Sequence, residues 1–188
     1  AMPWVRADDY HYPGLYHAGC YNHLSSTIAG QTVWDESIVN LPNGLSLGLQ
    51  LGGEEWLSLE DVEVLHYEQV LGLCDGVMTR TMRVRDRLGR VTAISEERLV
   101  SMADPNLVAL GLTIKPENWS GTITFRSEID AAVVNSNLEK HADFARKHLR
   151  ISGKGREGDE LFLSVGTLNS QLEVELRTRH WVSAPVHN

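Results

Sequence analysis

Alternation of apolar and polar residues with a period of two dominates the sequence from residue 45 onward. Runs of this pattern, rich in Val, Leu and Thr, cover residues 62–70, 77–84, 91–100, 107–114, 122–129, 161–167 and 172–179. A period of two places successive side chains on opposite faces of a strand, whereas a helix repeats every 3.6 residues. Parallel strands would need crossover helices, and the pattern leaves no room for them. The sequence therefore predicts an all-β, antiparallel β-sandwich of nine or ten short strands.

Turn residues place the ends of several strands. Asp86-Arg-Leu-Gly89 predicts a tight turn between residues 77–84 and 91–100, because Asp can brace a turn and Gly can adopt positive φ. Gly52-Gly53 predicts a second hairpin, which joins residues 45–51 to residues 56–59. Residues 153–158 are expected to form a loop. Only residues 137–147 have helical spacing, so we expect at most one short helix.

Composition limits the class of protein. With 188 residues, 42% of them hydrophobic, one β-sandwich domain over residues 1–188 is expected. The formal net charge of −8 argues against nucleic-acid binding, which needs clustered Lys and Arg. No apolar run approaches the length of a membrane span, and the start lacks the pattern of a signal peptide, so we expect a cytoplasmic chain without a membrane partner. Cys20 and Cys74 are expected to be buried free thiols.

Residues capable of catalysis do not form a recognisable set. Asp35 and Glu36 are adjacent, so on a strand they would point to opposite faces and could not act together as acid and base. His11, His17 and His23 are six residues apart, but Pro13 and Gly14 interrupt any common strand. We therefore expect no catalytic residue, no metal site and no cofactor.

The five Trp residues leave an alternative open. Flat aromatic rings can stack on sugar rings, so Trp34, Trp56 or Trp119 could serve a free-standing carbohydrate-binding module. The five are scattered through the chain, however, and most such rings close the core of a β-fold or its rim. Core or rim positions are the favoured interpretation.

Five stretches carry a family resemblance, in order along the chain: residues 14–22, 38–43, 73–86, 97–110, and 118–121 followed by 126–130. Together they resemble the N-terminal domain of glycoside hydrolase family 65, which holds trehalose, maltose and kojibiose phosphorylases and related trehalases. The resemblance implies a galactose-mutarotase-like β-supersandwich that packs on an (α/α)6 catalytic barrel. A barrel of twelve helices does not fit in 188 residues of strands. The chain is thus expected to be an inactive fragment of a larger enzyme that acts on an α-linked glucose disaccharide.

The same resemblance implies the barrel as partner and allows a homodimer. Candidates for a substrate-binding or barrel-facing rim are Tyr21, Asn22, Trp34, Asn40 and Asn43. The alternative is a structured loop, because Asn and Pro have turn-forming chemistry of their own. An exposed apolar seam toward the barrel is expected to include Tyr16, Tyr21, Trp34, Leu41 and Pro42.

Overall fold

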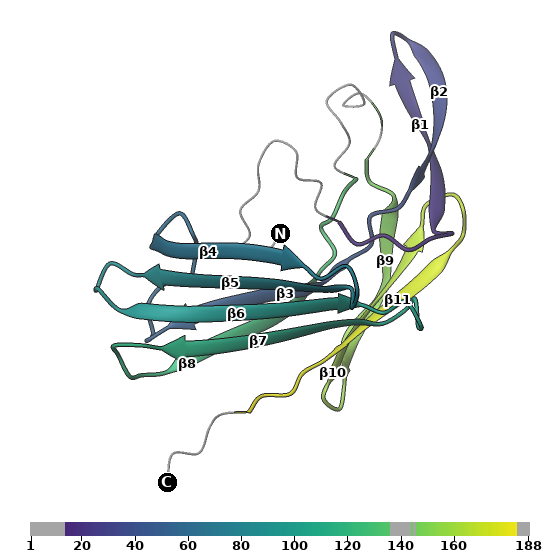
Figure 1. Ribbon diagram of the computed structural model, residues 1–188. Helices are drawn as coiled ribbons and strands as arrows, with labels where there is room; N and C mark the ends of the chain where they lie inside the picture. The colour runs from purple at the N-terminus through teal and green to yellow at the C-terminus, as the bar shows by residue number, and fades with distance from the viewer. Residues whose placement is uncertain (1–13, 136–143, 145, 184–188) are drawn as a thin grey trace. The chain divides into compact units, whose positions relative to one another are not determined.

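The computed structural model describes residues 14–135, 144 and 146–183, and these contain strands but no helix (Figure 1). The strands are β1 (Tyr21–Ile28), β2 (Gln31–Ile38), β3 (Asn43–Leu51), β4 (Glu63–Leu71), β5 (Val77–Arg85), β6 (Val91–Val100), β7 (Val108–Pro116), β8 (Ile123–Asp130), β9 (Leu149–Glu157), β10 (Glu160–Thr167) and β11 (Glu173–Arg179). The predicted all-β, antiparallel class is confirmed. Most of the expected helix at 137–147 lies outside the described residues.

Two compact units make up the described chain. Unit 1 holds residues 47–127, and unit 2 holds residues 14–46 and 128–183. β3 and β8 form a two-stranded sheet. The division between the units falls after residues 46 and 127, so each of these two strands has residues in both units. The expectation of a single domain over residues 1–188 stays a prediction.

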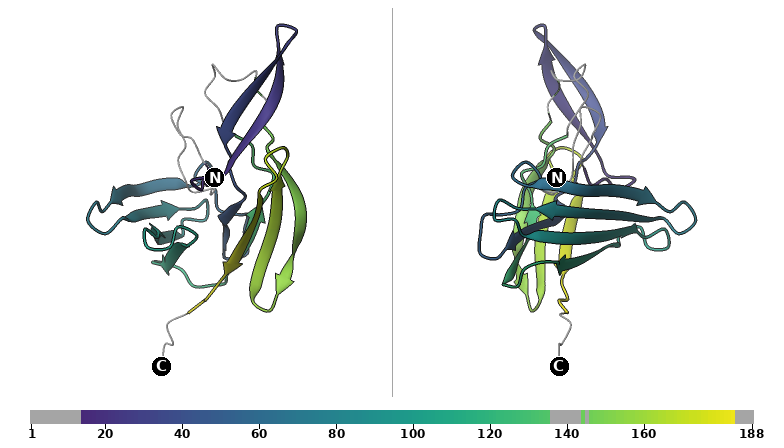
Figure 2. Two further views of the ribbon diagram at one scale, coloured as in Figure 1. Left: turned by 90° about the vertical axis from the view of Figure 1, so that its right-hand side faces the viewer. Right: turned by 60° about the vertical axis from the view of Figure 1, so that its left-hand side comes forward.

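Unit 1 contains an antiparallel sheet of strand order β4-β5-β6-β7, which Figure 2 shows from two sides. The predicted hairpin at its centre is confirmed, with Arg85 opposite Val91. Asp86 Oδ1 accepts hydrogen bonds from the backbone N–H groups of Leu88, at 2.9 Å, and Arg90, at 3.0 Å. Gly89 takes φ of 76°, a conformation that glycine adopts without strain.

A buried ion pair lies on one face of this sheet. Arg80 of β5 is opposite Glu96 of β6, and their side chains meet at 3.0 Å with 3% and 0% exposure. Arg98 also binds Glu96, at 2.8 Å, and Gln69 accepts two hydrogen bonds from the Arg80 guanidinium. Arg80 and Glu96 therefore each have an oppositely charged partner in a buried site, as buried charges require. The neighbouring pair on the same face, Met82 opposite Ile94, is apolar and buried.

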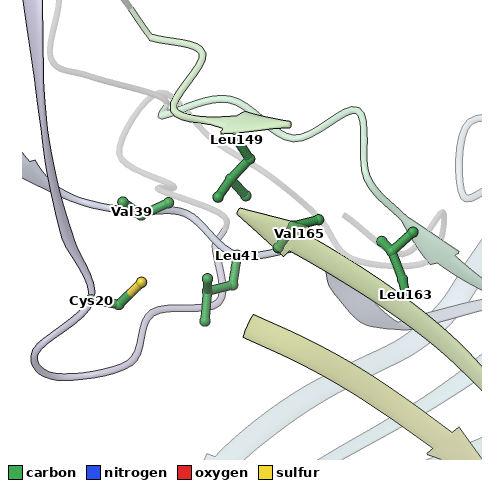
Figure 3. Packing of buried hydrophobic residues seen from close by; sticks show 6 residues of the cluster. All are labelled: Cys20, Val39, Leu41, Leu149, Leu163 and Val165. Carbon is green, nitrogen blue, oxygen red and sulfur yellow. The ribbon is translucent and has the colours of Figure 1, made fainter. Parts of the chain in front are cut away.

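Unit 2 combines the β1–β2 hairpin with a sheet of strand order β11-β10-β9. The hairpin turns at Ala29-Gly30, where both residues have positive φ, at 50° and 78°. This is the geometry of the two-residue turn whose twist matches that of the flanking strands. Figure 3 shows the apolar core of the unit, formed by Cys20, Val39, Leu41, Leu149, Leu163 and Val165.

Three local expectations were wrong. The chain turns at Gly52-Gly53 as expected, with positive φ at both residues, but residues 56–59 form no strand: they return only through an isolated antiparallel bridge from Trp56 to Gln50, and the sheet partner of β3 is β8. Residues 153–157, expected as a loop, belong to β9. Cys20 is buried as expected, but Cys74 is exposed in the turn between β4 and β5. Among the described residues, no helix is long and apolar enough to cross a membrane.

Replacing Glu96 with Gln should destabilise the protein by about 3–5 kcal/mol, because it leaves Arg80 buried without a countercharge. Glu63→Gln is the matched control, since Glu63 also pairs with an arginine of β5, at 2.6 Å, but both side chains are about half exposed. That change should cost less than about 1 kcal/mol. Urea unfolding would measure both. Equal losses for the two variants would contradict the structural role of the buried pair.

Candidate functional site

The candidate rim residues lie in unit 2, on the β1–β2 hairpin and in the segment that follows it. Tyr21 is 46% exposed and Trp34 is 62% exposed. Tyr21 pairs with Ile38, and Ser25 pairs with Trp34, so the register places both aromatic rings on the same face of the hairpin. His23 follows Tyr21 by two residues and so lies on the same face of β1, and its ring centroid is 5.7 Å from that of Trp34. This exposed aromatic face is available for contact with another molecule.

Asn22 has the opposite surroundings, because its side chain is fully buried. Its Oδ1 accepts hydrogen bonds from the backbone N–H groups of Asn169 and Ser170, each at 3.0 Å. Its Nδ2 lies 3.1 Å from Nδ1 of His148. The carboxamide therefore joins β1 to the turn between β10 and β11 and to the residue before β9. These bonds give Asn22 a structural role.

Asn40 is a second buried carboxamide. Its Oδ1 accepts from the backbone N–H of Leu15, at 3.0 Å, and its Nδ2 donates to the carbonyl of Val134, at 2.9 Å. Asn135 completes the connection: its Oδ1 accepts from the Asn40 N–H, and its Nδ2 donates to the Ile38 carbonyl. Two amide side chains thus connect the end of β2 to residues that follow β8. The sequence gives no local signal for a contact between residues so far apart.

Asn43 and the predicted seam divide between turn, core and surface. Asn43 Oδ1 accepts from the N–H of Leu45 two residues on, which is turn chemistry. Leu41 is 5% exposed within the core cluster, and Pro42 is fully buried, so the expectation of an exposed seam was wrong for these two. Tyr16 is 40% exposed. Whether the five rim residues contact substrate or barrel stays a prediction.

The acidic residues of the hairpin do not form a catalytic pair. Asp35 and Glu36 are consecutive on β2 and so point to opposite faces, as the sequence predicted. Asp35 Oδ2 accepts a hydrogen bond from Ser37 Oγ at 2.7 Å. Within the described parts of the chain, no group of three or more His, Cys, Asp or Glu side chains is placed to hold a metal ion.

Unit 1 holds a shallow pocket of about 200 Å³ beside the turn between β5 and β6. Trp56, which is 37% exposed, forms part of its wall. The guanidinium of Arg126 lies 4.6 Å from the centre of the Trp56 ring. Glu54 and Glu55 also line the pocket, next to an ion pair between Asp61 and Arg87 at 2.8 Å. Aromatic and ionic groups are thus combined in one depression.

His148, which lies just before β9 and beside Asn22, is a buried titratable residue with 3% exposure. The two backbone donors to Asn22 Oδ1 fix the orientation of the carboxamide, so Nδ2 faces the imidazole and Nδ1 of His148 must accept. The imidazole proton is then on Nε2, which is buried without a hydrogen-bond partner among the described residues. Burial lowers the pKa of His148, and the negative charge of Asp35 offsets part of that effect. The structure therefore favours neutral His148.

This preference predicts a pH dependence of stability. Because the pKa of folded His148 lies below its unfolded value of about 6.5, the stabilisation is complete above that pH and is lost as the pH falls toward the folded pKa. Urea unfolding at pH 7.5 and pH 5.5 should show lower stability at the acidic pH. His148→Gln should reduce this difference. An undiminished difference in the His148 variant would contradict the assignment.

Comparison with known proteins identifies the family. The family model described as glycosyl hydrolase family 65, N-terminal domain, matches residues 2–188. An uncharacterized glycosyl hydrolase of Mycobacterium tuberculosis is 42% identical over 169 residues, which are 90% of this chain and 13% of the relative. Kojibiose phosphorylase of Thermoanaerobacter brockii is 31% identical over 172 residues, 86% of this chain and 21% of the enzyme.

A solved structure has the same fold. A protein assigned as a kojibiose phosphorylase from the human microbiome superposes with a TM-score of 0.68 at 19% identity, covering 87% of this chain and 24% of that one. The chain thus spans less than a quarter of the length of these three proteins. The match of the family model over residues 2–188 shows that this chain belongs to the N-terminal domain family of glycosyl hydrolase family 65.

Proposed function

We propose that this chain is the non-catalytic N-terminal domain of a larger family 65 enzyme that acts on an α-linked glucose disaccharide, such as kojibiose, trehalose or maltose. Family membership supports the class of parent enzyme, and a kojibiose phosphorylase is among the similar proteins. The part of the parent outside this domain carries the catalysis. The domain supports that part and contributes to its assembly.

The observation that carries the non-catalytic role is that three buried polar side chains, those of Asn22, Asn40 and Glu96, are occupied by structural bonds. Asn22 and Asn40 use their carboxamides to join segments of unit 2. Glu96, the buried acid of unit 1, is paired with two arginines. Hydrolysis of a glycosidic bond in most glycoside hydrolases uses two carboxyl groups on either side of the bond, about 5–9.5 Å apart. The adjacent acids of β2 point to opposite faces and cannot meet that requirement.

The exposed aromatic face of the hairpin gives the domain a contact surface. Asn22 anchors the start of β1 and Asn40 anchors the chain just after β2, so the positions of Tyr21 and Trp34 are set by buried hydrogen bonds. Aromatic rings held on a rigid element are frequent anchors at protein interfaces. We therefore place the contact of the hairpin with the remainder of the parent enzyme at Tyr21 and Trp34.

A carbohydrate-binding module is the second candidate, and the Trp56 pocket favours it. The pocket combines an aromatic ring with the carboxylates of Glu54 and Glu55, which lack a side-chain partner among the described residues. Carboxylates can accept hydrogen bonds from sugar hydroxyls, while an aromatic face can cover the ring. The pocket is smaller than the range of about 300–1,000 Å³ typical of ligand sites, which favours the support role.

Purified chain should neither cleave nor bind kojibiose, trehalose or maltose. Product release would be assayed with and without inorganic phosphate, and binding would be measured by calorimetric titration of the same sugars. We expect no product, because the adjacent acids Asp35 and Glu36 point to opposite faces of β2, and no heat of binding, because the Trp56 pocket is smaller than typical ligand sites. Turnover that disappears with Asp35→Asn or Glu36→Gln would overturn the non-catalytic role. Binding that disappears with Trp56→Ala, but persists with Trp34→Ala, would establish the binding module instead.

A further inference from the structure

One end of the β4–β7 sheet in unit 1 exposes five large apolar side chains, which we call the end patch. The patch consists of Leu71, Leu73, Val100, Met102 and Leu107, which are 58%, 89%, 55%, 96% and 54% exposed. Single exposed apolar residues are common, but several in one place generally mark an interaction site. The end patch is separate in sequence from the aromatic face of the hairpin in unit 2.

Sheet topology brings these five residues to the same end. The strands are antiparallel, so the turn from β4 to β5 and the loop from β6 to β7 lie at one end of the sheet. Four strands spaced at about 4.8 Å span about 14 Å there. Backbone hydrogen bonds close both connections, from Gly72 N–H to Val77 O and from Ser101 N–H to Leu107 O. The patch is therefore carried by ordered turns.

Burial on this face of the sheet stops at the ion pair of Arg80 and Glu96. Arg80 and Glu96 form the last fully buried row on their face of the sheet. In the next row Arg98 is partly exposed, and Leu71, two residues beyond Gln69 on β4, is exposed. Val100 continues the same face of β6 and is also exposed. Beyond Arg80 and Glu96, toward the β4–β5 turn, the sheet again carries apolar side chains, and no described residue buries them.

We propose that the end patch docks onto the part of the parent polypeptide that lies outside this domain. This inference rests on the proposed function, because it requires a larger parent protein. The relatives support it: the matched residues are 13% of the M. tuberculosis protein and 21% of the T. brockii enzyme, so most of each relative lies outside the domain. The rest of the parent polypeptide can therefore cover the apolar end patch that the isolated domain exposes.

Charges beside the patch favour this occupant over a second copy of the chain. Asp75 and Asp104, in the two connections that carry the patch, are exposed acids. Each braces its own turn through one carboxylate oxygen, which accepts from the N–H of Val77 and of Asn106 respectively. Pairing two end patches would bring four acids together in a protein of net charge −8, which like-charge repulsion disfavours. The docked surface should therefore be apolar with basic residues at its edge.

Hydroxyl-radical footprinting tests the proposal by comparing the 188-residue chain with the full polypeptide encoded by its reading frame. Modification of Leu73, Met102 and Leu107 should be about tenfold slower in the full polypeptide, because a docked site reacts only when it opens. Leu88 is the internal control: it is 65% exposed in the turn at the opposite end of the same sheet, and its rate should not change.

Equal rates for the end patch in both proteins would overturn the proposal. Sedimentation of the 188-residue chain tests whether a second copy covers the patch instead. If the chain forms a dimer that the double variant Met102→Ser/Leu107→Ser disrupts and Leu88→Ser does not, the patch is a dimer contact and the proposal is overturned. Failure here is distinguishable from failure of the proposed function. An inactive chain with an unprotected patch refutes only docking, whereas an active chain with a protected patch refutes only the non-catalytic role.

Discussion

The buried carboxamide of Asn22 is the interaction on which unit 2 depends most. It accepts from two backbone amides of the turn between β10 and β11 and faces His148 just before β9. Three segments that are far apart in sequence therefore meet at one side chain with no exposure to water. An unmet buried hydrogen bond costs about 1–3 kcal/mol, so the segments are held in one arrangement. The hairpin that presents Tyr21 and Trp34 begins at this point.

The buried polar contact of unit 1 is an ion pair, whereas those of unit 2 are hydrogen bonds of amide side chains. Arg80 and Glu96 are buried beside the apolar pair of Met82 and Ile94, and removing Glu96 would leave Arg80 without a countercharge. Both units contain buried polar groups that are bonded to one another or to the backbone, and each unit also exposes some large apolar side chains. Met102 in unit 1 and Trp34 in unit 2 are the clearest examples. This distribution suits a domain whose surfaces are completed by the rest of a larger protein.

Sequence reasoning predicted the strands that have local signals and missed those that lack them. The β5–β6 hairpin was predictable because Asp86 and Gly89 supply turn chemistry between two alternating runs. β9 was taken for a loop because it is rich in glycine, but a side chain at Gly155 would lie 2.8 Å from the Phe162 ring of β10, so glycine makes room for that ring. For the candidate site, Asn22 was predicted as a rim residue, but its buried hydrogen bonds to Asn169 and Ser170 join positions too far apart in sequence for any local pattern to reveal.

Amide hydrogen exchange of Asn22→Ala tests most directly whether Asn22 joins β1 to the turn between β10 and β11 through its buried hydrogen bonds. The account predicts that the amides of Asn169 and Ser170 lose about tenfold or more of their protection, because their acceptor is gone. Amides of β5 and β6 in unit 1 should exchange as before. Unchanged protection at Asn169 and Ser170 would contradict the account, because the turn would then be held without Asn22.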